Sequence, residues 1–276
     1  MSEPEFDIIL EQNRRVANYW KDLWKFRGLF YFLSWRDILV RYKQTAIGIA
    51  WSIIRPLVTM VIFTIIFGKL AKLPDGGVPY VLLVCAGMLP WQFFANAFSE
   101  ASNSLVANSS MLSKVYFPRL IIPASSVIVA LIDFCISFGI LIVLMIWYRF
   151  VPGPQIVFMP LFLLLAIIVT LGAGFWIAAL NVKYRDFRYV VPFIVQFGLY
   201  ISPVGFTSSV IPEKLRLIYS LNPMVGVIDG FRWSIFGGNC PIDFTGFTIS
   251  VVLSVLLFIY GLYFFRKMER SFADII

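Results

Sequence analysis

The sequence predicts an all-α integral membrane protein with six transmembrane helices, an N-terminal amphipathic interfacial helix, and short re-entrant helices between spans 5 and 6. Its 276 residues are 60% hydrophobic and 14% charged, with a mean hydropathy of +0.85. Soluble domains are about 45–50% apolar and about 25% charged, so a water-soluble globule could not bury this much apolar surface. Apolar tracts of about 20 residues, the length that crosses a hydrocarbon core of roughly 30 Å, recur along the chain.

Residues 1–45 form the first predicted segment, which is cytoplasmic or interfacial. Its bulky apolar residues recur at helical spacing: Val16, Tyr19, Trp20, Leu23 and Trp24. Two tryptophans on a face edged by cations favour a helix that lies at the bilayer surface. A soluble amphipathic helix packed against a partner protein is the alternative.

The membrane domain follows over residues 46–265, and a cytoplasmic tail covers 266–276. The predicted spans are 46–67, 79–99, 121–147, 157–180, 189–206 and 245–265. The region 207–240 is expected to re-enter the membrane without crossing it. Within this region, Asn222-Pro223 is a good helix start and Gly237-Gly238 a good stop. The 14 residues between them give a helix of about 21 Å, which is too short to cross.

Loop cations predict the orientation of the chain. With both termini in the cytoplasm, the cytoplasmic segments contain 16 of the 23 Lys and Arg residues and the outer segments contain 6, while Arg55 lies within span 1. This excess predicts a multi-pass protein with six crossings and both chain ends inside.

The composition argues against catalysis and against nucleic-acid binding. The sequence has no histidine, and Cys85, Cys135 and Cys240 are far apart, so we expect neither a zinc site nor a disulfide framework. It contains no G-x-x-x-x-G-K loop of the kind that binds nucleotide phosphates. It also has no basic cluster dense enough for nucleic acid. We therefore expect this chain to bind no metal, no cofactor and no nucleic acid.

Two charged residues are expected inside the membrane, namely Arg55 in span 1 and Asp133 midway along span 3. An ionised group at that depth is costly unless it faces protein or water. We hypothesise that the two side chains pair or share an aqueous cavity. The alternative is that Arg55 extends toward the cytoplasm.

Two helical faces combine aromatic rings with polar groups and are predicted to line a conduit. The face on span 1 contains Trp51, Ser52, Arg55, Thr59 and Phe63, and the face on span 5 contains Tyr189, Phe193, Gln196, Phe197 and Tyr200. Aromatic rings can stack on the C–H faces of sugars while a few polar groups form hydrogen bonds, so a glycan could slide without tight capture. Alternatively, these residues are interfacial aromatics and helix-packing residues.

Two short cytoplasmic segments combine aromatic residues with cations, which is typical of a docking surface for a protein partner. One joins spans 2 and 3, and the other is the turn 181–188. The candidate docking residues are Lys114, Tyr116, Phe117, Pro118, Arg119, Tyr184, Arg185 and Asp186.

The chain resembles the membrane-spanning permease of type-2 ABC exporters, in the bacterial polysaccharide branch that moves O-antigen, capsule or wall teichoic acid. The matching stretches cover nearly the whole chain in the same order. They are WRDILVRYKQTAIGIAWSIIRPL (35–57), GMLPWQFF (87–94), SKVYFPRLIIP (113–123), NVKYRDFRYVVPF (181–193), ISPVGF (201–206), NPMVGVIDGFRWSIFG (222–237) and FRKMERSFADII (265–276).

This resemblance implies a permease that is not an enzyme by itself. Two copies of the chain would pair with two copies of a cytoplasmic ATPase subunit, which binds ATP and Mg. Residues 110–119 would correspond to the coupling helix, 16–43 to the interfacial helix and 207–240 to the re-entrant helices. The cargo would be a polyprenyl-pyrophosphate-linked polysaccharide, threaded across the bacterial cytoplasmic membrane through a tunnel at the dimer axis. Arg55 would then contact a cargo phosphate.

Three other functions are considered. A type-2 ABC exporter of a small lipophilic molecule or drug predicts an aliphatic cavity without the aromatic and polar faces. A membrane glycosyltransferase or polymerase requires metal-binding carboxylates, which the sequence does not place together. A purely structural scaffold does not explain two charges inside the membrane.

Overall fold

The computed structural model describes residues 16–43, 48–112, 114–269 and 272, and over these residues every regular element is helical. Parts of the predicted terminal segments, 1–15 and most of 270–276, lie outside the described residues. The elements are α1 (Val16–Lys25), α2 (Arg27–Lys43), α3 (Gly48–Phe63), η1 (Thr64–Leu70), α4 (Tyr80–Ala107), α5 (Ser109–Leu112), α6 (Ile121–Trp147), η2 (Pro154–Phe158), α7 (Met159–Lys183), α8 (Phe187–Ile201), η3 (Ser208–Val210), α9 (Glu213–Tyr219), α10 (Pro223–Phe236), η4 (Gly237–Asn239) and α11 (Phe244–Glu269).

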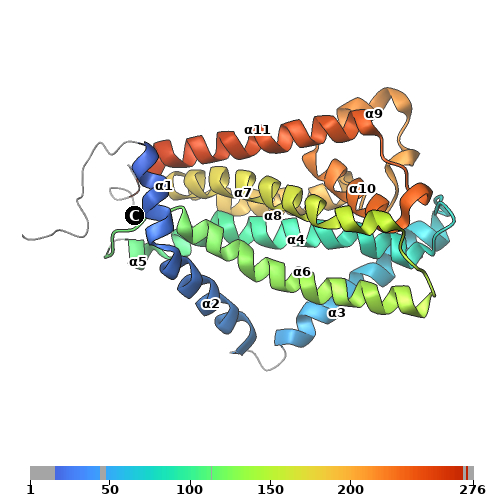
Figure 1. Cartoon of the computed structure of the whole chain (residues 1–276), viewed down its shortest axis with the longest axis horizontal. Helices are drawn as coiled ribbons and strands as arrows, with labels where there is room; N and C mark the ends of the chain where they lie inside the picture. Colours follow the sequence, from blue (N-terminus) through green and yellow to red (C-terminus); the bar gives the residue numbers. More distant parts are fainter. Residues whose placement is uncertain (1–15, 44–47, 113, 270–271, 273–276) are drawn as a thin grey trace, which may run out of the picture.

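Five helical segments within the described residues are long and apolar enough to cross a membrane, and they match five of the six predicted spans. They are Ala50–Leu70, Tyr80–Ala107, Ile121–Trp147, Pro154–Lys183 and Phe244–Glu269. In Figure 1 they run along the long axis of the molecule, with α3 inclined to the others. α1 lies at one end of this bundle and α9 at the other, and these are called the α1 end and the α9 end below.

The predicted fifth span, 189–206, is not one continuous crossing helix. α8 ends at Ile201, and its 15 residues cover about 22 Å, which is less than the roughly 30 Å of a hydrocarbon core. The reason is local, because Pro203 has no N–H to continue the helix and disfavours helical geometry at Ser202. Ser202 to Gly205 continue from the helix as buried turns.

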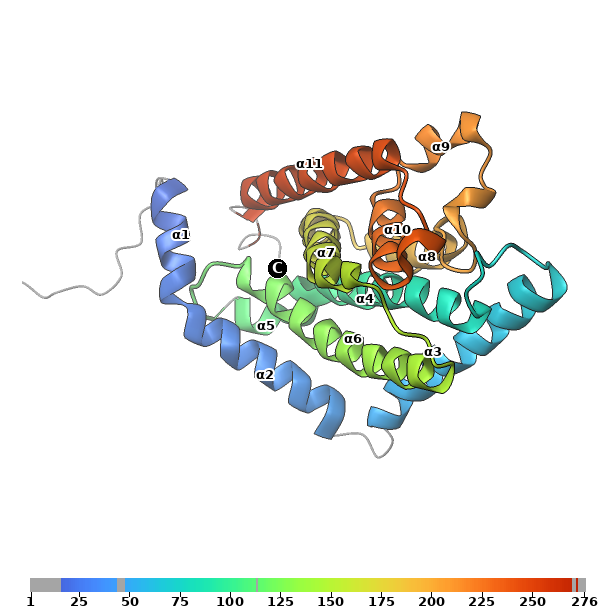
Figure 2. The same cartoon turned by 45° about the vertical axis from the view of Figure 1, so that its right-hand side comes forward.

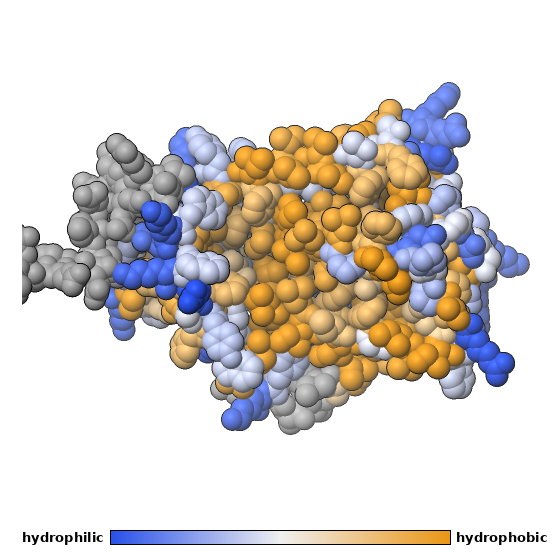
Figure 3. Space-filling view, viewed as in Figure 1, coloured by the Kyte–Doolittle hydropathy of each residue, from blue (hydrophilic) through white to orange (hydrophobic). Residues whose placement is uncertain are grey.

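A belt of apolar side chains surrounds the middle of the bundle. Figure 3 shows hydrophobic residues over the central part of the visible face and hydrophilic residues toward both ends. Large apolar side chains on the long helices, such as Val143 of α6 and Val252 of α11, are exposed. Apolar surface on this scale needs a lipid environment.

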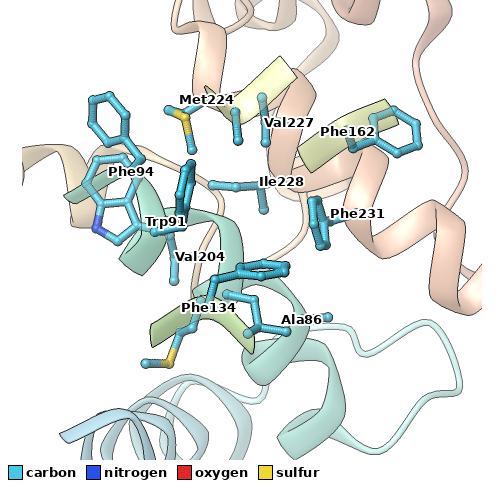
Figure 4. Packing of buried hydrophobic residues seen from close by; sticks show 14 of the residues in the cluster. Ala86, Trp91, Phe94, Phe134, Phe162, Val204, Met224, Val227, Ile228 and Phe231 are labelled. Atoms are coloured by element: carbon cyan, nitrogen blue, oxygen red, sulfur yellow. The ribbon is translucent and has the colours of Figure 1, made fainter. Parts of the chain in front are cut away.

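α10 is the short helix that the sequence predicts between Asn222 and Gly237. The Asn222 side chain accepts a hydrogen bond from the Met224 amide (3.0 Å), and Gly237 ends the helix with a φ of +58°. The helix packs among α4, α7 and α11 rather than lying on the surface. Figure 4 shows its residues Ile228 and Phe231 directed into the core, where the Phe231 ring lies 5.8 Å from that of Phe134 on α6.

α7 and α11 approach each other closely because two glycines face each other. A Cβ atom on Gly261 would overlap the carbonyl oxygen of Gly172, and a Cβ on Gly172 would lie 2.7 Å from the backbone of Phe258. Small residues at this crossing let the two backbones touch, as is common between membrane helices.

At the α1 end, the N-terminal segment folds back along the bundle. α1 and α2 are separated by a break at Phe26, and α2 runs beside α6 (Figure 2). The two tryptophans of α1, Trp20 and Trp24, are exposed, as an interfacial helix requires.

Candidate functional site

A cavity of about 750 Å³ opens among α2, α3, α4, α6 and α8. Five residues of the two predicted conduit faces line it, namely Trp51, Ser52, Arg55 and Thr59 on α3 and Gln196 on α8. Helices α3 and α8 are far apart in the sequence, so the structure brings the two predicted faces to one place.

The aromatic residues of α8 form an exposed strip beside this cavity. Tyr189, Phe193, Phe197 and Tyr200 are 50–72% exposed, and the rings of Phe193 and Phe197 lie 4.2 Å apart. Phe63 differs from the others, because it is buried and its ring lies 6.4 Å from that of Tyr200. Phe63 therefore joins α3 to α8, whereas the α8 rings remain available to a partner or a cargo.

Asp133 on α6 forms its ion pair with Arg41, not with Arg55. Its Oδ2 atom lies 2.6 Å from an Arg41 guanidinium nitrogen, and its Oδ1 accepts hydrogen bonds from Tyr42 (2.6 Å) and Ser52 (3.2 Å). The hypothesised pair with Arg55 is therefore wrong, because Arg41 and Tyr42 at the C-terminal end of α2 occupy the carboxylate oxygens. Arg55 is exposed and lines the same cavity, as the second half of that hypothesis proposed.

Arg41 also forms an ion pair with Glu100 on α4, so one arginine connects α2 to both α4 and α6. The pKa of Tyr42 is raised above its ordinary value by burial and by its hydrogen bond to Asp133. Sequence reasoning missed Arg41, Tyr42 and Glu100. A signal was present in α4, where Gln92, Asn96, Ser99 and Glu100 place polar groups at helical spacing on a helix whose first half is almost entirely apolar.

A second polar junction joins three segments at the α1 end. The Glu269 carboxylate at the end of α11 accepts hydrogen bonds from the Arg119 amide (2.9 Å) and from the Tyr19 hydroxyl (3.2 Å). The Arg119 guanidinium in turn donates to the Glu269 carbonyl (2.7 Å). The start of α6 and the end of α11 thus cap each other, with the charges that each helix terminus favours. Burial and the nearby Glu269 raise the pKa of Tyr19.

Apart from Arg119, which is half-buried in the junction with Glu269, the predicted docking residues fall into two groups. Lys114, Tyr116, Tyr184, Arg185 and Asp186 are exposed at the α1 end. Phe117 and Pro118 are buried, and Phe117 belongs to a hydrophobic cluster that includes Leu33 of α2. These two residues therefore anchor the docking segment to the bundle rather than face a partner.

Arg232, which the orientation argument assigns to an outer loop, is buried within α10. Its guanidinium donates to the carbonyl oxygens of Leu83 (3.2 Å), Val204 (2.8 Å) and Phe206 (2.5 Å). It holds the turns that follow α8 against the start of α4. Its charge therefore lies in the protein interior and not in an exposed outer loop.

Neither polar cluster has the arrangement of an active site. No three Cys, Asp or Glu side chains of the described ranges come together as a metal ion would require. A polar, partly aromatic cavity among membrane-crossing helices instead has the organisation of a membrane permease.

The comparisons with known proteins identify the family. Residues 28–236 match the family described as ABC-2 type transporter, and the chain belongs to that family. It is 28% identical over 242 residues to the O-antigen export system permease protein RfbA of Klebsiella pneumoniae, covering 87% of this chain and 92% of the relative. The protein of the same name from Myxococcus xanthus is 26% identical over 92% of this chain and 97% of its own. The capsule polysaccharide export inner-membrane protein CtrC of Neisseria meningitidis is 24% identical over 75% and 78%, respectively.

Proposed function

We propose that this chain is the permease half of an ATP-driven exporter that moves a polyprenyl-pyrophosphate-linked polysaccharide across the bacterial cytoplasmic membrane. Relatives that cover most of the chain are named as O-antigen or capsule polysaccharide export proteins. Membership of a transporter family argues against the membrane glycosyltransferase alternative. The aromatic strip of α8 argues against a purely aliphatic drug cavity.

The single observation that carries the proposal is the pairing of the α3 and α8 faces around one cavity. The exposed rings of Phe197 and Tyr200 lie beside a cavity that also receives Arg55 and Gln196. Exposed polar side chains on adjacent membrane helices, here Arg55 and Gln196, require a partner surface or water. A second copy of the chain placed over this face would turn a half-open cavity into a closed conduit.

The direction of the helices supports six passes with both ends in the cytoplasm. Helices α3, α4, α6, α7, α8 and α11 alternate in direction along the chain (Figure 1). The hydrogen bond between Tyr19 and Glu269 places the start and the end of the described chain at the same end of the bundle. In this arrangement α8 and the turns after it complete the fifth pass, and α9 and α10 re-enter from the outside. The α1 end then faces the cytoplasm.

ATP hydrolysis belongs to a separate ATPase subunit in this proposal, with two ATPase copies serving two permeases. The exposed residues Tyr116, Tyr184 and Arg185 at the α1 end would form the docking surface for those subunits. The anchor formed by Phe117 and the junction at Arg119 would transmit their motion into α6 and α11.

The experiment that tests the proposal is export by a double variant, Phe197→Ala with Tyr200→Ala, expressed with its ATPase. We expect loss of surface glycan, while co-purification of the ATPase stays unchanged. Val190→Ala with Ile194→Ala is the matched control, because it removes two exposed apolar side chains of the same helix that carry no aromatic ring. Wild-type export by the Phe197 and Tyr200 variant would refute the conduit assignment.

A further inference from the structure

A second cavity, of about 400 Å³, lies at the α9 end. η3, α9, α10 and the segment between α10 and α11 form its wall. Its volume falls within the range of about 300–1,000 Å³ typical of small-molecule sites. In the proposed topology this end faces the outside of the membrane.

The charges that line this cavity balance. Arg216 and Arg232 contribute two positive charges, and Asp229 and Asp243 contribute two negative charges. Arg232 is already committed to three backbone carbonyls, and Arg216 donates to the carbonyl of Ile211 (3.2 Å). A strongly anionic or cationic ligand would therefore meet opposition from one pair or the other.

Two polar groups in the wall keep hydrogen-bonding capacity. The Tyr219 hydroxyl is buried and has no hydrogen-bond partner among the described residues. The Asp229 carboxylate also lines the cavity, and a carboxylate can accept at about four lone-pair sites. Burial raises the pKa of Asp229 above its ordinary value. Leaving such groups unpaired is costly, which disfavours an apolar occupant such as a lipid chain.

We propose that this cavity binds one sugar unit of the cargo glycan on the outer side of the membrane, a proposal that rests on the proposed function. A sugar ring is uncharged and presents several hydroxyl groups around an apolar face. Asp229 accepts from those hydroxyls, Tyr219 donates to one, and the Phe247 ring in the same wall offers apolar contact. A unit held here would resist the return of the chain through the conduit.

Cys240 gives a direct probe, because this free thiol also lines the cavity. In a Cys85→Ala, Cys135→Ala background, the rate at which methyl methanethiosulfonate modifies Cys240 is measured on the purified permease. The reaction is run at alkaline pH, because burial raises the pKa of the Cys240 thiol and the thiolate is the reactive form. The probes are glucose, galactose, mannose, rhamnose and N-acetylglucosamine at equal millimolar concentration, with the open-chain polyol sorbitol as the control.

We expect at least one of the cyclic sugars to slow modification of Cys240 several-fold, while sorbitol leaves it unchanged. Tyr219→Phe removes one oxygen atom and Asp229→Asn removes one charge, and each should reduce or abolish this protection. Cys135, which is exposed on α6, is the control thiol in a Cys85→Ala, Cys240→Ala background, and sugars should not protect it. The site is refuted if no sugar protects Cys240, or if protection survives both wall variants.

The outcome is independent of export, because the assay contains neither the ATPase nor a lipid-linked glycan. A chain that exports glycan but never shows protected Cys240 would refute the sugar site alone. Protection of Cys240 in a chain that exports no glycan would refute the proposed function alone.

Discussion

Replacing Glu269 should loosen the junction between α1, the start of α6 and the end of α11. The carboxylate accepts two hydrogen bonds, from the Arg119 amide and from the Tyr19 hydroxyl. Hydrogen bonds to charged groups contribute about 1.5–3 kcal/mol each. Because Glu269 is only partly buried, we take the lower value, and Glu269→Ala should lower the free energy of unfolding by about 3 kcal/mol. Glu269→Gln keeps an acceptor oxygen and should lose less.

The free energy of unfolding can be measured by denaturant titration of the purified permease in mixed micelles. Glu213→Ala is the matched control, because Glu213 is an exposed carboxylate at the other end of the bundle and should change stability by less than about 0.5 kcal/mol. The same variants are then assayed with the ATPase. If the junction transmits motion, Glu269→Gln should reduce glycan exported per ATP hydrolysed more than it reduces ATPase binding. Stability and coupling ratio both equal to wild type in Glu269→Ala would contradict the role of this junction.

Three further outcomes are expected. In a double-mutant cycle, the effects of Asp133→Asn and Arg41→Gln on the free energy of unfolding should differ from additivity by about 0.5–3 kcal/mol. The effects of Asp133→Asn and Arg55→Gln should add. Additivity of the first pair would show that the ion pair does not contribute to stability. Gly261→Val should overpack the crossing of α7 and α11 and cost about 1–3 kcal/mol by thermal unfolding in detergent, and an unchanged melting temperature would show that the helices can separate freely. Arg232→Met should leave three carbonyl oxygens without their donor and lower the free energy of unfolding by at least about 3 kcal/mol, measured by the same method. Arg216→Met is the more exposed control. Equal losses of stability in the two variants would contradict the buried role of Arg232.

Helix positions could be predicted from the sequence because they follow from local chemistry. Apolar length predicts the five long spans, and a capping asparagine with a terminal glycine predicts α10. The predicted end of the fifth span at residue 206 is wrong, although a local signal was present, because Pro203 stops the helix within an apolar tract that continues beyond it.

Long-range partners could not be predicted from the sequence. Equal depth in the membrane is a property of many residues, so the sequence offered no way to choose between Arg41 and Arg55 as the partner of Asp133. Arg232 binds backbone carbonyls, one of which lies 149 residues earlier in the chain. Carbonyl groups occur at every position, so no residue pattern identifies such an arrangement.

The shortness of α8 has a consequence for any hydrophilic polymer that passes beside it. A helix of about 22 Å leaves roughly a quarter of a 30 Å hydrocarbon layer to non-helical turns, whose backbone N–H and C=O groups are polar. The apolar helical stretch along which the sugars of the proposed cargo would move is correspondingly shorter than the hydrocarbon layer is thick. Fewer carbohydrate hydroxyls are then stripped of water at any one moment, which lowers the barrier to each forward step.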